Sequence, residues 1–270
     1  MVARVGERDT VTEAPPTTDV GQAYWEVVPR RRSPLRHAAT PVVVLLALGA
    51  LYLYVSGKQL DSIEQRRLNW DFISTSTLRH VEIAMIATVV VALLAVPTGI
   101  LLTRGFSRPF RPVVLALANV GQAVPSIGVI ALLTIIWTIG LRTAIVALVA
   151  YAFLPILRNT MVGLQQVDPS IIEAGRGMGM TRRRVLARIE LPLAVPVILA
   201  GIRTALVITV GTAALATYIN AGGLGDIIVY GLVQNRFTIT LTGAVLTAAL
   251  ALLIDWVAGI AEDLLRPRGL

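Results

Sequence analysis

The feature that most constrains this chain is a series of six apolar stretches, each about as long as a bilayer is thick. They cover residues 38–56, 80–103, 112–139, 141–161, 192–218 and 238–261. An α-helix needs about 20 mostly apolar residues to cross the hydrocarbon core. Only 15% of the 270 residues are charged, whereas soluble domains carry about 25%. The sequence therefore predicts an all-α, polytopic membrane protein with about six transmembrane helices.

The first 37 residues are polar and basic, with three consecutive arginines at 30–32. Such a composition cannot bury a core, which favours a disordered tail. A cleaved signal peptide is the alternative, because a basic run precedes an apolar stretch. The basic run starts late, however, and no small-residue cleavage site follows Val55. We therefore expect residues 1–37 to remain as a tail.

The basic residues are distributed unequally between alternate loops. Seventeen of the 24 lie in residues 1–37, 104–111, 158–190 and 262–270, six lie in the alternate loops, and Arg203 lies inside the fifth span. Lys and Arg accumulate on the cytoplasmic side of membrane proteins. This asymmetry predicts that both termini and residues 163–191 are cytoplasmic, and it accounts for the net charge of +8 without nucleic acid.

The loop at 163–191 contains signals for two short helices. Asp168 and Pro169 are typical of a helix start, because the aspartate accepts amide hydrogen bonds and proline has no amide to leave unpaired. Gly177 and Gly179 predict a tight reversal that ends this first helix. The first helix is therefore expected to be short.

Thr181 is the predicted N-cap of the second helix in this loop. Val185, Leu186 and Ile189 share one face of it, which makes the helix amphipathic. We expect Pro192 to close it.

Seven residues of this loop resemble the "EAA" motif of permeases from ATP-binding cassette (ABC) importers. They are Glu173, Ala174, Gly175, Gly179, Ile189, Leu191 and Pro192, at the full motif spacing. Gly175 stands where the family usually has Ala, which weakens a helix by up to about 1 kcal/mol and could move the turn earlier. In that family the loop is a coupling helix that docks on the ATPase subunit. The resemblance implies a type I importer fold and an ATPase-coupling role for these residues.

Four further segments resemble permeases for glycine betaine, choline, carnitine and related osmoprotectants: residues 119–126, 155–160, 201–203 and 222–225. The resemblance covers residues 77–261 and implies a type-1 ABC transmembrane domain there. Residues 38–76 would then be an additional transmembrane helix with an external loop, and residues 262–270 a cytoplasmic tail. Methionine permeases share this architecture, so methionine or another small solute remains the alternative substrate.

The resemblance also implies which partners supply the chemistry. The only lysine, Lys58, is not part of a phosphate-binding Gly-x-x-x-x-Gly-Lys-Ser/Thr loop. We therefore expect no enzyme activity and no cofactor in this chain, with ATP and Mg bound by separate ATPase subunits. The other implied partners are a second copy or a related permease, an extracytoplasmic solute-binding protein and the lipid of a bacterial cell membrane.

No catalytic or metal site is predicted. The chain has no Cys, and its two histidines, His37 and His80, are far apart in the sequence. Thiolate ligands and an imidazole cluster are therefore not available.

Polar and helix-breaking residues within the spans predict the translocation path. Gln122, Pro125 and Ser126 interrupt the third apolar stretch, and irregular backbone at membrane depth requires protein or a water-filled cavity around it. Three more candidates, for which an interfacial position is the alternative, are Asn159, Tyr218 and Asn220. The Gly-rich residues 222–225 are either a flexible turn or part of an external gate.

Arg203 lies about a dozen residues into the fifth span, where a charge needs a partner or water. Glu82 and Asp255 are the two acidic residues within spans, and the pair could be structural or could change between transport states. A secondary transporter or channel, the alternative from another class, would use such carboxylates for ion coupling. It would also show two similar halves if built from inverted repeats, and no such repeat is evident.

Overall fold

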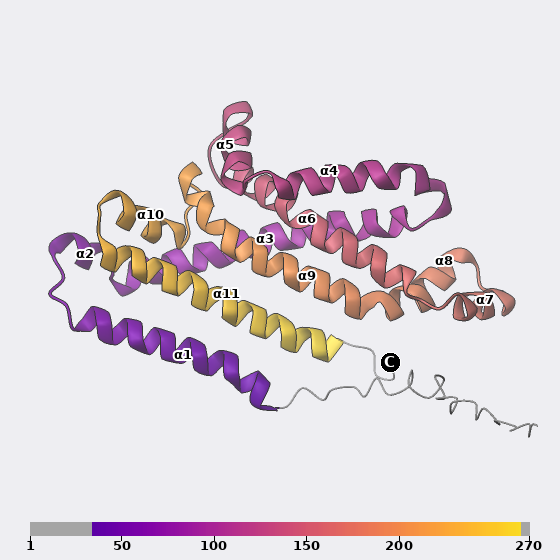
Figure 1. The fold of residues 1–270 in the computed structure, drawn as a ribbon, viewed down its shortest axis with the longest axis horizontal. Coiled ribbons are helices and arrows are strands. Elements are labelled where there is room, and N and C mark those ends of the chain that lie inside the picture. The colour runs from indigo at the N-terminus through magenta and orange to yellow at the C-terminus, as the bar shows by residue number, and fades with distance from the viewer. Residues whose placement is uncertain (1–33, 266–270) are drawn as a thin grey trace, which may run out of the picture.

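The computed structural model describes residues 34–265, with side chains from residue 38 onward. Every regular element in this part of the chain is helical, as predicted (Figure 1). In chain order the elements are α1 (Pro34–Ser56), α2 (Ser62–Arg67), α3 (Trp70–Leu102), η1 (Gly105–Phe110), α4 (Arg111–Ala123), α5 (Ser126–Ile136), α6 (Leu141–Gln165), α7 (Pro169–Gly177), α8 (Arg182–Val185), η2 (Leu186–Glu190), α9 (Leu191–Ala213), η3 (Ala214–Ile219), α10 (Gly225–Val233) and α11 (Phe237–Leu265).

Three long helices, α3, α6 and α9, form the centre of the molecule, and α6 packs against both of the others (Figure 1). Small residues allow the close approach. A Cβ on Gly99 of α3 would lie 2.7 Å from Thr160 of α6, and one on Gly201 of α9 would lie 2.6 Å from Asn159 of α6. Lipid tails give no hydrophobic drive for helix association, so such tight contacts stabilise a membrane bundle.

The number of spans agrees with the prediction, with one difference in form. Five helical segments of the described chain are long and apolar enough to cross a membrane: residues 38–56, 70–102, 141–165, 182–219 and 237–265. The third predicted span, residues 112–139, is instead two helices, α4 and α5, that meet at 101°. The described chain therefore has five spans, or six if this bent pair counts as one.

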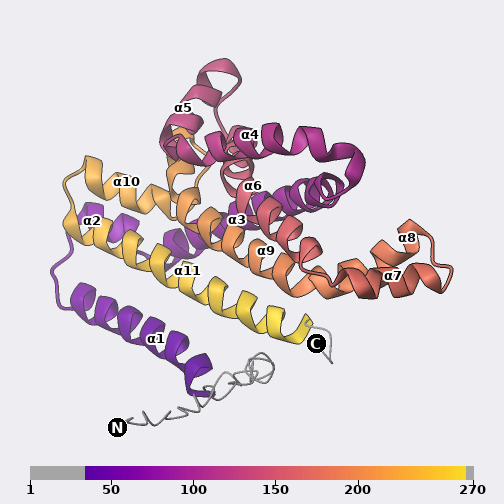
Figure 2. The same cartoon turned by 45° about the vertical axis from the view of Figure 1, so that its right-hand side comes forward.

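The bend between α4 and α5 follows from Pro125. The residue before a proline is pushed out of the helical region, and Val124 is extended, with φ −72° and ψ 134°. Pro125 then precedes the first residue of α5, Ser126. Figure 2 shows α5 turning away from the line of α4.

Two predicted loops also contain helices. Residues 57–79 were expected to be an external polar loop, but they hold α2 and the first turns of α3, which begins at Trp70. The side chain of Asn69 caps this start by accepting a 2.8 Å hydrogen bond from the Phe72 amide. The Gly-rich residues 222–225 were expected to be a flexible turn or part of an external gate, and α10 begins at the last of them, Gly225.

The first and last long helices lie side by side at the edge of the bundle (Figures 1 and 2). Only 6% of the apolar stretch of α1 is buried inside the described structure, with Val44 packed inward. α11 continues to Leu265, into the segment expected to be a tail. The predicted tail at 1–37 lies outside the described residues up to residue 33.

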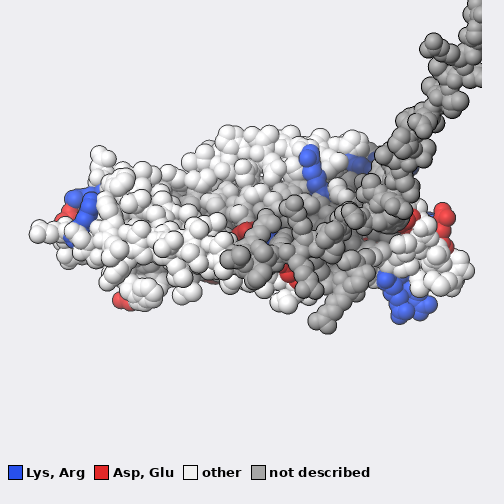
Figure 3. Space-filling model, turned by 60° about the horizontal axis from the view of Figure 1, so that its bottom comes forward, with Lys and Arg blue, Asp and Glu red and all other residues white. Residues whose placement is uncertain are grey.

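The bundle has two distinct ends. One carries α7 and α8, and the opposite one carries α2 and α10 (Figure 1). We call them the α7–α8 end and the α2–α10 end. On the face drawn in Figure 3, uncharged surface separates the charges at one tip from those nearer the other end. This arrangement fits a protein whose middle lies in lipid.

Candidate functional site

The motif loop folds as predicted in its first half. The Asp168 carboxylate accepts a 2.8 Å hydrogen bond from the Ser170 amide, and Pro169 is the first residue of α7. That amide hydrogen bond holds the pKa of the exposed Asp168 below its usual 3.8. α7 runs to Gly177, so the glycine at position 175 does not end it early.

The reversal after α7 depends on Gly179. Its φ is +82°, a conformation that side chains with a Cβ rarely adopt. The Gly179 amide donates to Arg176 O (2.9 Å), and the Met180 amide donates to Gly175 O (3.1 Å). Thr181 then caps α8, accepting a 3.4 Å hydrogen bond from the Arg184 amide. Both the predicted turn and the predicted cap are confirmed.

The two arms of the loop pack together at Gly175. A Cβ there would lie 2.6 Å from Ile189 Cδ1 and 3.6 Å from Val185 Cγ2. Val185 is fully buried, whereas Leu186 packs toward Leu164, Ala194 and Ile198 of the bundle. The missing methyl of Gly175 thus lets Ile189 approach α7 closely.

The prediction that Pro192 closes the second helix is wrong. α8, η2 and α9 follow one another without a break, so residues 182–219 form one helical segment. η2 is a π-helical turn, and Pro192 lies in the first turn of α9. The wider turn accommodates a proline that has no amide to donate. The motif loop is therefore continuous with the fifth span.

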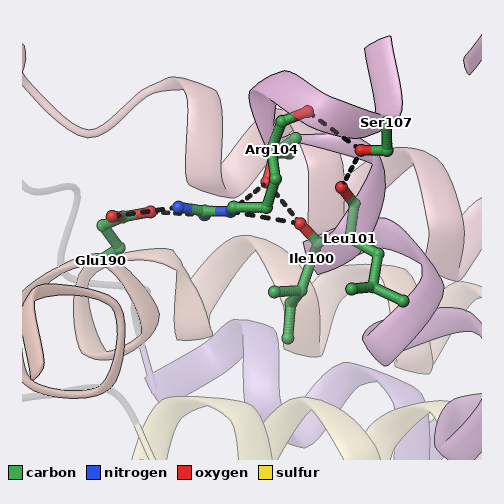
Figure 4. Close-up of polar contacts among 6 residues, drawn as sticks. Ile100, Leu101, Arg104, Ser107 and Glu190 are labelled. Carbon is green, nitrogen blue, oxygen red and sulfur yellow. Dashed lines mark hydrogen bonds and ion pairs between the residues drawn. The ribbon is translucent and has the colours of Figure 1, made fainter. Parts of the chain in front are cut away.

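A partly buried ion pair joins this continuous helix to the end of α3 (Figure 4). Arg104 Nη1 and Nη2 donate to the two carboxylate oxygens of Glu190, at 3.2 and 2.5 Å. The Glu190 side chain is only 7% exposed. Arg104 Nε also donates to Ile100 O (3.3 Å), which holds the guanidinium in place. A bidentate pair of this kind fixes geometry as well as charge.

The corner that carries Arg104 is itself tied down. The Ser107 hydroxyl lies against the carbonyls of Leu101 and Arg104 (Figure 4). Arg111 donates two hydrogen bonds to Leu102 O, at 3.1 and 2.9 Å. Arg104 therefore reaches Glu190 from a fixed position.

Neither partner of this ion pair was predicted from the sequence. A signal was present, because Glu190 is the only acidic residue between Glu173 and Asp226 and lies among apolar and basic neighbours.

The other motif residues differ in their exposure. Glu173 and Ala174 are exposed on α7, while Leu191 and Pro192 are half-buried at the start of α9.

The residues predicted to line the translocation path lie in three places. Gln122, Pro125 and Ser126 lie at the bend between α4 and α5. The Asn159 side chain donates to Pro155 O (2.8 Å) within α6 and faces Gly201. The remaining two, in or next to η3, are Tyr218, which is half-exposed, and Asn220, which is left-handed with φ 58°. A role in the path stays a prediction for all six.

Arg203 pairs with Asp255, one of the two predicted candidates. Its Nε and Nη2 donate to the Asp255 carboxylate at 2.6 and 2.7 Å, and Nη1 contacts Glu262 at 3.4 Å. Gly259 provides the space, since a Cβ there would lie 2.9 Å from Nη1. The other candidate, Glu82, pairs instead with Arg79 (2.8 Å).

The α2–α10 end is held by different contacts, centred on the buried His80 of α3. Its Nε2 lies 2.8 Å from Val210 O of α9, and its Nδ1 accepts from the Leu224 amide at 3.2 Å. Since a backbone amide can only donate, the proton is on Nε2. One neutral imidazole therefore joins α3, α9 and the start of α10.

Comparison with known proteins identifies the family. Residues 95–267 match the profile of the family described as "Binding-protein-dependent transport system inner membrane component". The chain belongs to this family. It is a multi-pass membrane permease subunit of an ABC importer, and this membership rejects a secondary transporter or channel.

Several relatives are similar over most of the chain. The carnitine transport permease OpuCD of Listeria monocytogenes is 40% identical over 78% of this chain and 93% of its own length. The choline transport system permease OpuBB of Bacillus subtilis is 41% identical over 72% and 88%. The osmoprotectant import permease OsmY of Salmonella typhimurium is 39% identical over 79% and 88%.

Solved structures confirm the type I importer fold. The inward-facing methionine ABC transporter MetNI matches with a TM-score of 0.63 and 26% identity, over 72% of this chain and 96% of that one. An amino acid ABC transporter, solved with histidines, matches with a TM-score of 0.63 and 16% identity, over 76% of this chain and 99% of that one.

Proposed function

We propose that this chain forms the translocation path of an importer for a compatible solute, such as glycine betaine, choline, carnitine or proline betaine. It couples that path, through α7 and α8, to ATP hydrolysis on a separate subunit. Its partners are ABC ATPase subunits, a second permease chain and an extracytoplasmic solute-binding protein. Both termini and the α7–α8 end lie in the cytoplasm.

The observation that carries the coupling role is the continuity of the motif loop with the fifth span. A displacement of α7 reaches η2 through the Gly175–Ile189 contact. From η2 it passes along one uninterrupted helix into the bundle. The Arg104–Glu190 pair joins the base of this helix to α3. A push on α7 would therefore be transmitted to two central spans.

The substrate assignment is supported by sequence similarity. The relatives at about 40% identity are named for carnitine, choline or osmoprotectants, while the methionine transporter is 26% identical. Methionine is the second candidate on the strength of that structural match. ATP would drive transport by binding one arrangement of the ATPases more tightly than the other.

Uptake by the reconstituted complex tests the function. The permease, its ATPase and its solute-binding protein are placed in proteoliposomes with ATP inside. We expect accumulation of radiolabelled glycine betaine, choline or carnitine, with methionine as the matched control. Uptake of methionine alone would overturn the substrate proposal. ATP hydrolysis by the permease without an ATPase subunit would overturn the proposal that a separate subunit hydrolyses ATP.

Cysteine labelling tests the orientation, and the chain has no cysteine to remove first. Ser62 in α2 and Ser170 in α7 are both exposed, on opposite ends of the molecule. In intact cells, Ser62→Cys should react with a membrane-impermeant thiol reagent and Ser170→Cys should not. The reverse labelling pattern would show that the arginine asymmetry was misread.

A further inference from the structure

A basic cleft lies between the end of α3 and the α8–η2 helix. Its volume is about 450 Å3, and the residues that line it include Arg104, Arg176, Arg182, Arg183 and Glu190. Sites for small ligands or headgroups have volumes in this range. Four arginines against one glutamate leave an excess of positive charge that nothing described so far uses.

The arginines of the cleft differ in their partners. Arg104 is neutralised by Glu190. Arg176, Arg182 and Arg183 are exposed, and none of the three forms an ion pair within residues 34–265. Each guanidinium offers a planar fork of donors that matches phosphate oxygens. The cleft therefore presents three unpaired donors around a fixed ion pair.

The aromatic residues at the cleft indicate that it lies at the membrane surface. Phe106, which lines the cleft, is 74% exposed, and Phe110 nearby is 64% exposed. They follow directly on the end of the α3 span at Leu102. Exposed apolar rings on a segment that also carries basic residues are typical of the boundary between headgroups and acyl chains. A ligand here would meet arginines together with the apolar ring of Phe106.

We propose that this cleft binds the phosphate of an anionic phospholipid headgroup, with the acyl chains lying along Phe106 and Phe110. Basic clefts next to span ends attract anionic lipids of the cytoplasmic leaflet. The cytoplasmic position rests on the orientation proposed above. The lipid would join the base of the coupling loop to the membrane surface, which gives α8 a contact independent of any protein partner.

Lipid-quenching fluorescence tests the site on the purified full-length chain. Phe106→Trp places a fluorescent reporter on the cleft wall. Because the parent already has four tryptophans, the signal of the reporter is the difference in quenching between the variant and the parent. Brominated phosphatidylglycerol is compared with brominated phosphatidylcholine in bilayers. We expect a preference for phosphatidylglycerol of at least about fivefold, the attraction of about one basic residue.

Charge removal on one helix supplies the matched control. Arg182→Gln with Arg183→Gln should reduce the preference to about one. Arg184→Gln, on the same helix and equally exposed but outside the cleft, should leave it unchanged. Equal losses in both variants would mean a general surface-charge effect and would overturn the site.

Two additions separate the lipid from other ligands. If inorganic phosphate, at constant ionic strength, abolishes the preference, the ligand is a soluble phosphate and the lipid proposal fails. If adding the ATPase subunits abolishes it, the arginines contact protein and the proposal fails as well. Neither measurement involves transport, so failure of the lipid site is distinguishable from failure of the proposed function.

Discussion

The two ends of the bundle are attached in different ways. At the α2–α10 end, the segment at 221–236 is bonded to α3 by Arg79 and His80, to η3 by an Asp226–Thr217 contact and to Asp61 by Arg236. At the α7–α8 end, no side chain of α7 forms a hydrogen bond or ion pair with a described residue outside its own loop. The single polar tie, Arg104–Glu190, lies at the base.

This difference matches two mechanical roles. An element that must move is expected to have few buried contacts of its own. α7 fits that description, because it is held to η2 and α8 mainly by the contacts of Gly175 with Ile189 and Val185. The α2–α10 end, where the segment at 221–236 is bonded to α3, to η3 and to Asp61, is suited to keeping the spans in register. The following predictions test this contrast, from the largest expected effect to the smallest.

The largest effect is expected from Gly225→Ala at the start of α10. A Cβ there would lie 2.0 Å from the Ala214 carbonyl oxygen, so the backbone of η3 or α10 must shift. We expect a loss of about 3 kcal/mol or more of stability, measured as a fall in the midpoint of thermal unfolding in detergent. Gly211→Ala, with nothing within 4 Å, is the control. Equal melting of the two variants would show that the α2–α10 end is not tightly packed.

The next effect is expected at the base of the coupling loop. Glu190→Gln leaves the guanidinium of Arg104, which is 30% exposed, without its charge partner. Breaking a fully buried pair costs about 3–5 kcal/mol, so we expect about 2 kcal/mol here, seen as a lower unfolding midpoint.

A charge exchange distinguishes pairing from simple loss of charge. The double variant Arg104→Glu with Glu190→Arg should recover part of the stability and part of the solute uptake. The single variant Arg104→Lys keeps the opposite charges but should be less stable than the parent, because an ammonium cannot reproduce the bidentate geometry. If Glu190→Gln unfolds at the parental temperature, the pair does not hold the base of the loop.

The features of this fold differ in how well the sequence alone predicts them. The spans, the Asp168 and Thr181 caps and the positive φ of Gly179 follow from local patterns of apolar residues, caps and glycine. The Arg104–Glu190 pair joins residues 86 apart. His80 and Leu224 are 144 apart. Such contacts depend on how the helices pack, which local patterns do not specify.

Proline predictions held where the local sequence decides and failed at Pro192. Pro169 starts α7 and Pro125 interrupts the third apolar stretch, as predicted, whereas Pro192 interrupts nothing because a π-helical turn precedes it. A proline both removes an amide and restricts the residue before it. Whether a helix ends there or adapts is decided by the packing on either side.

A smaller effect is expected from the tip of the coupling loop. Gly179→Val puts a β-branched side chain at φ +82°, and Glu173→Ala removes an exposed carboxylate from α7. We expect normal membrane levels and uptake reduced at least about tenfold, which corresponds to about 1.4 kcal/mol of lost coupling. Gly177→Ala, exposed and with open space around its position, is the control. Solute uptake at the parental rate in both variants would mean that the match to the EAA motif is a coincidence and that this loop has no coupling role.

The smallest effect is expected from the two capping aspartates, one at each end. Asp61 accepts amide hydrogen bonds from Glu64 (2.8 Å) and Ile63 (3.0 Å) and also pairs with Arg236 (2.7 Å), whereas Asp168 caps α7 alone. The amide of Glu64 and, after it, the charge of Arg236 lower the pKa of Asp61 from 3.8. Asparagine caps a helix about as well as aspartate. Asp168→Asn should therefore be nearly silent, and Asp61→Asn should raise amide exchange in α2 by a few-fold.

The pH dependence of that exchange provides an independent check. Since the pKa of Asp61 is lowered in the folded protein, its contribution is complete above pH 3.8 and is lost as the pH falls through the lowered value. Amide exchange in α2, corrected for intrinsic rates, should rise in this acidic range in the parent but not in Asp61→Asn. If Asp168→Asn loosens α7 as much as Asp61→Asn loosens α2, the Arg236 pair contributes nothing. The two ends would then be attached more alike than their contacts indicate.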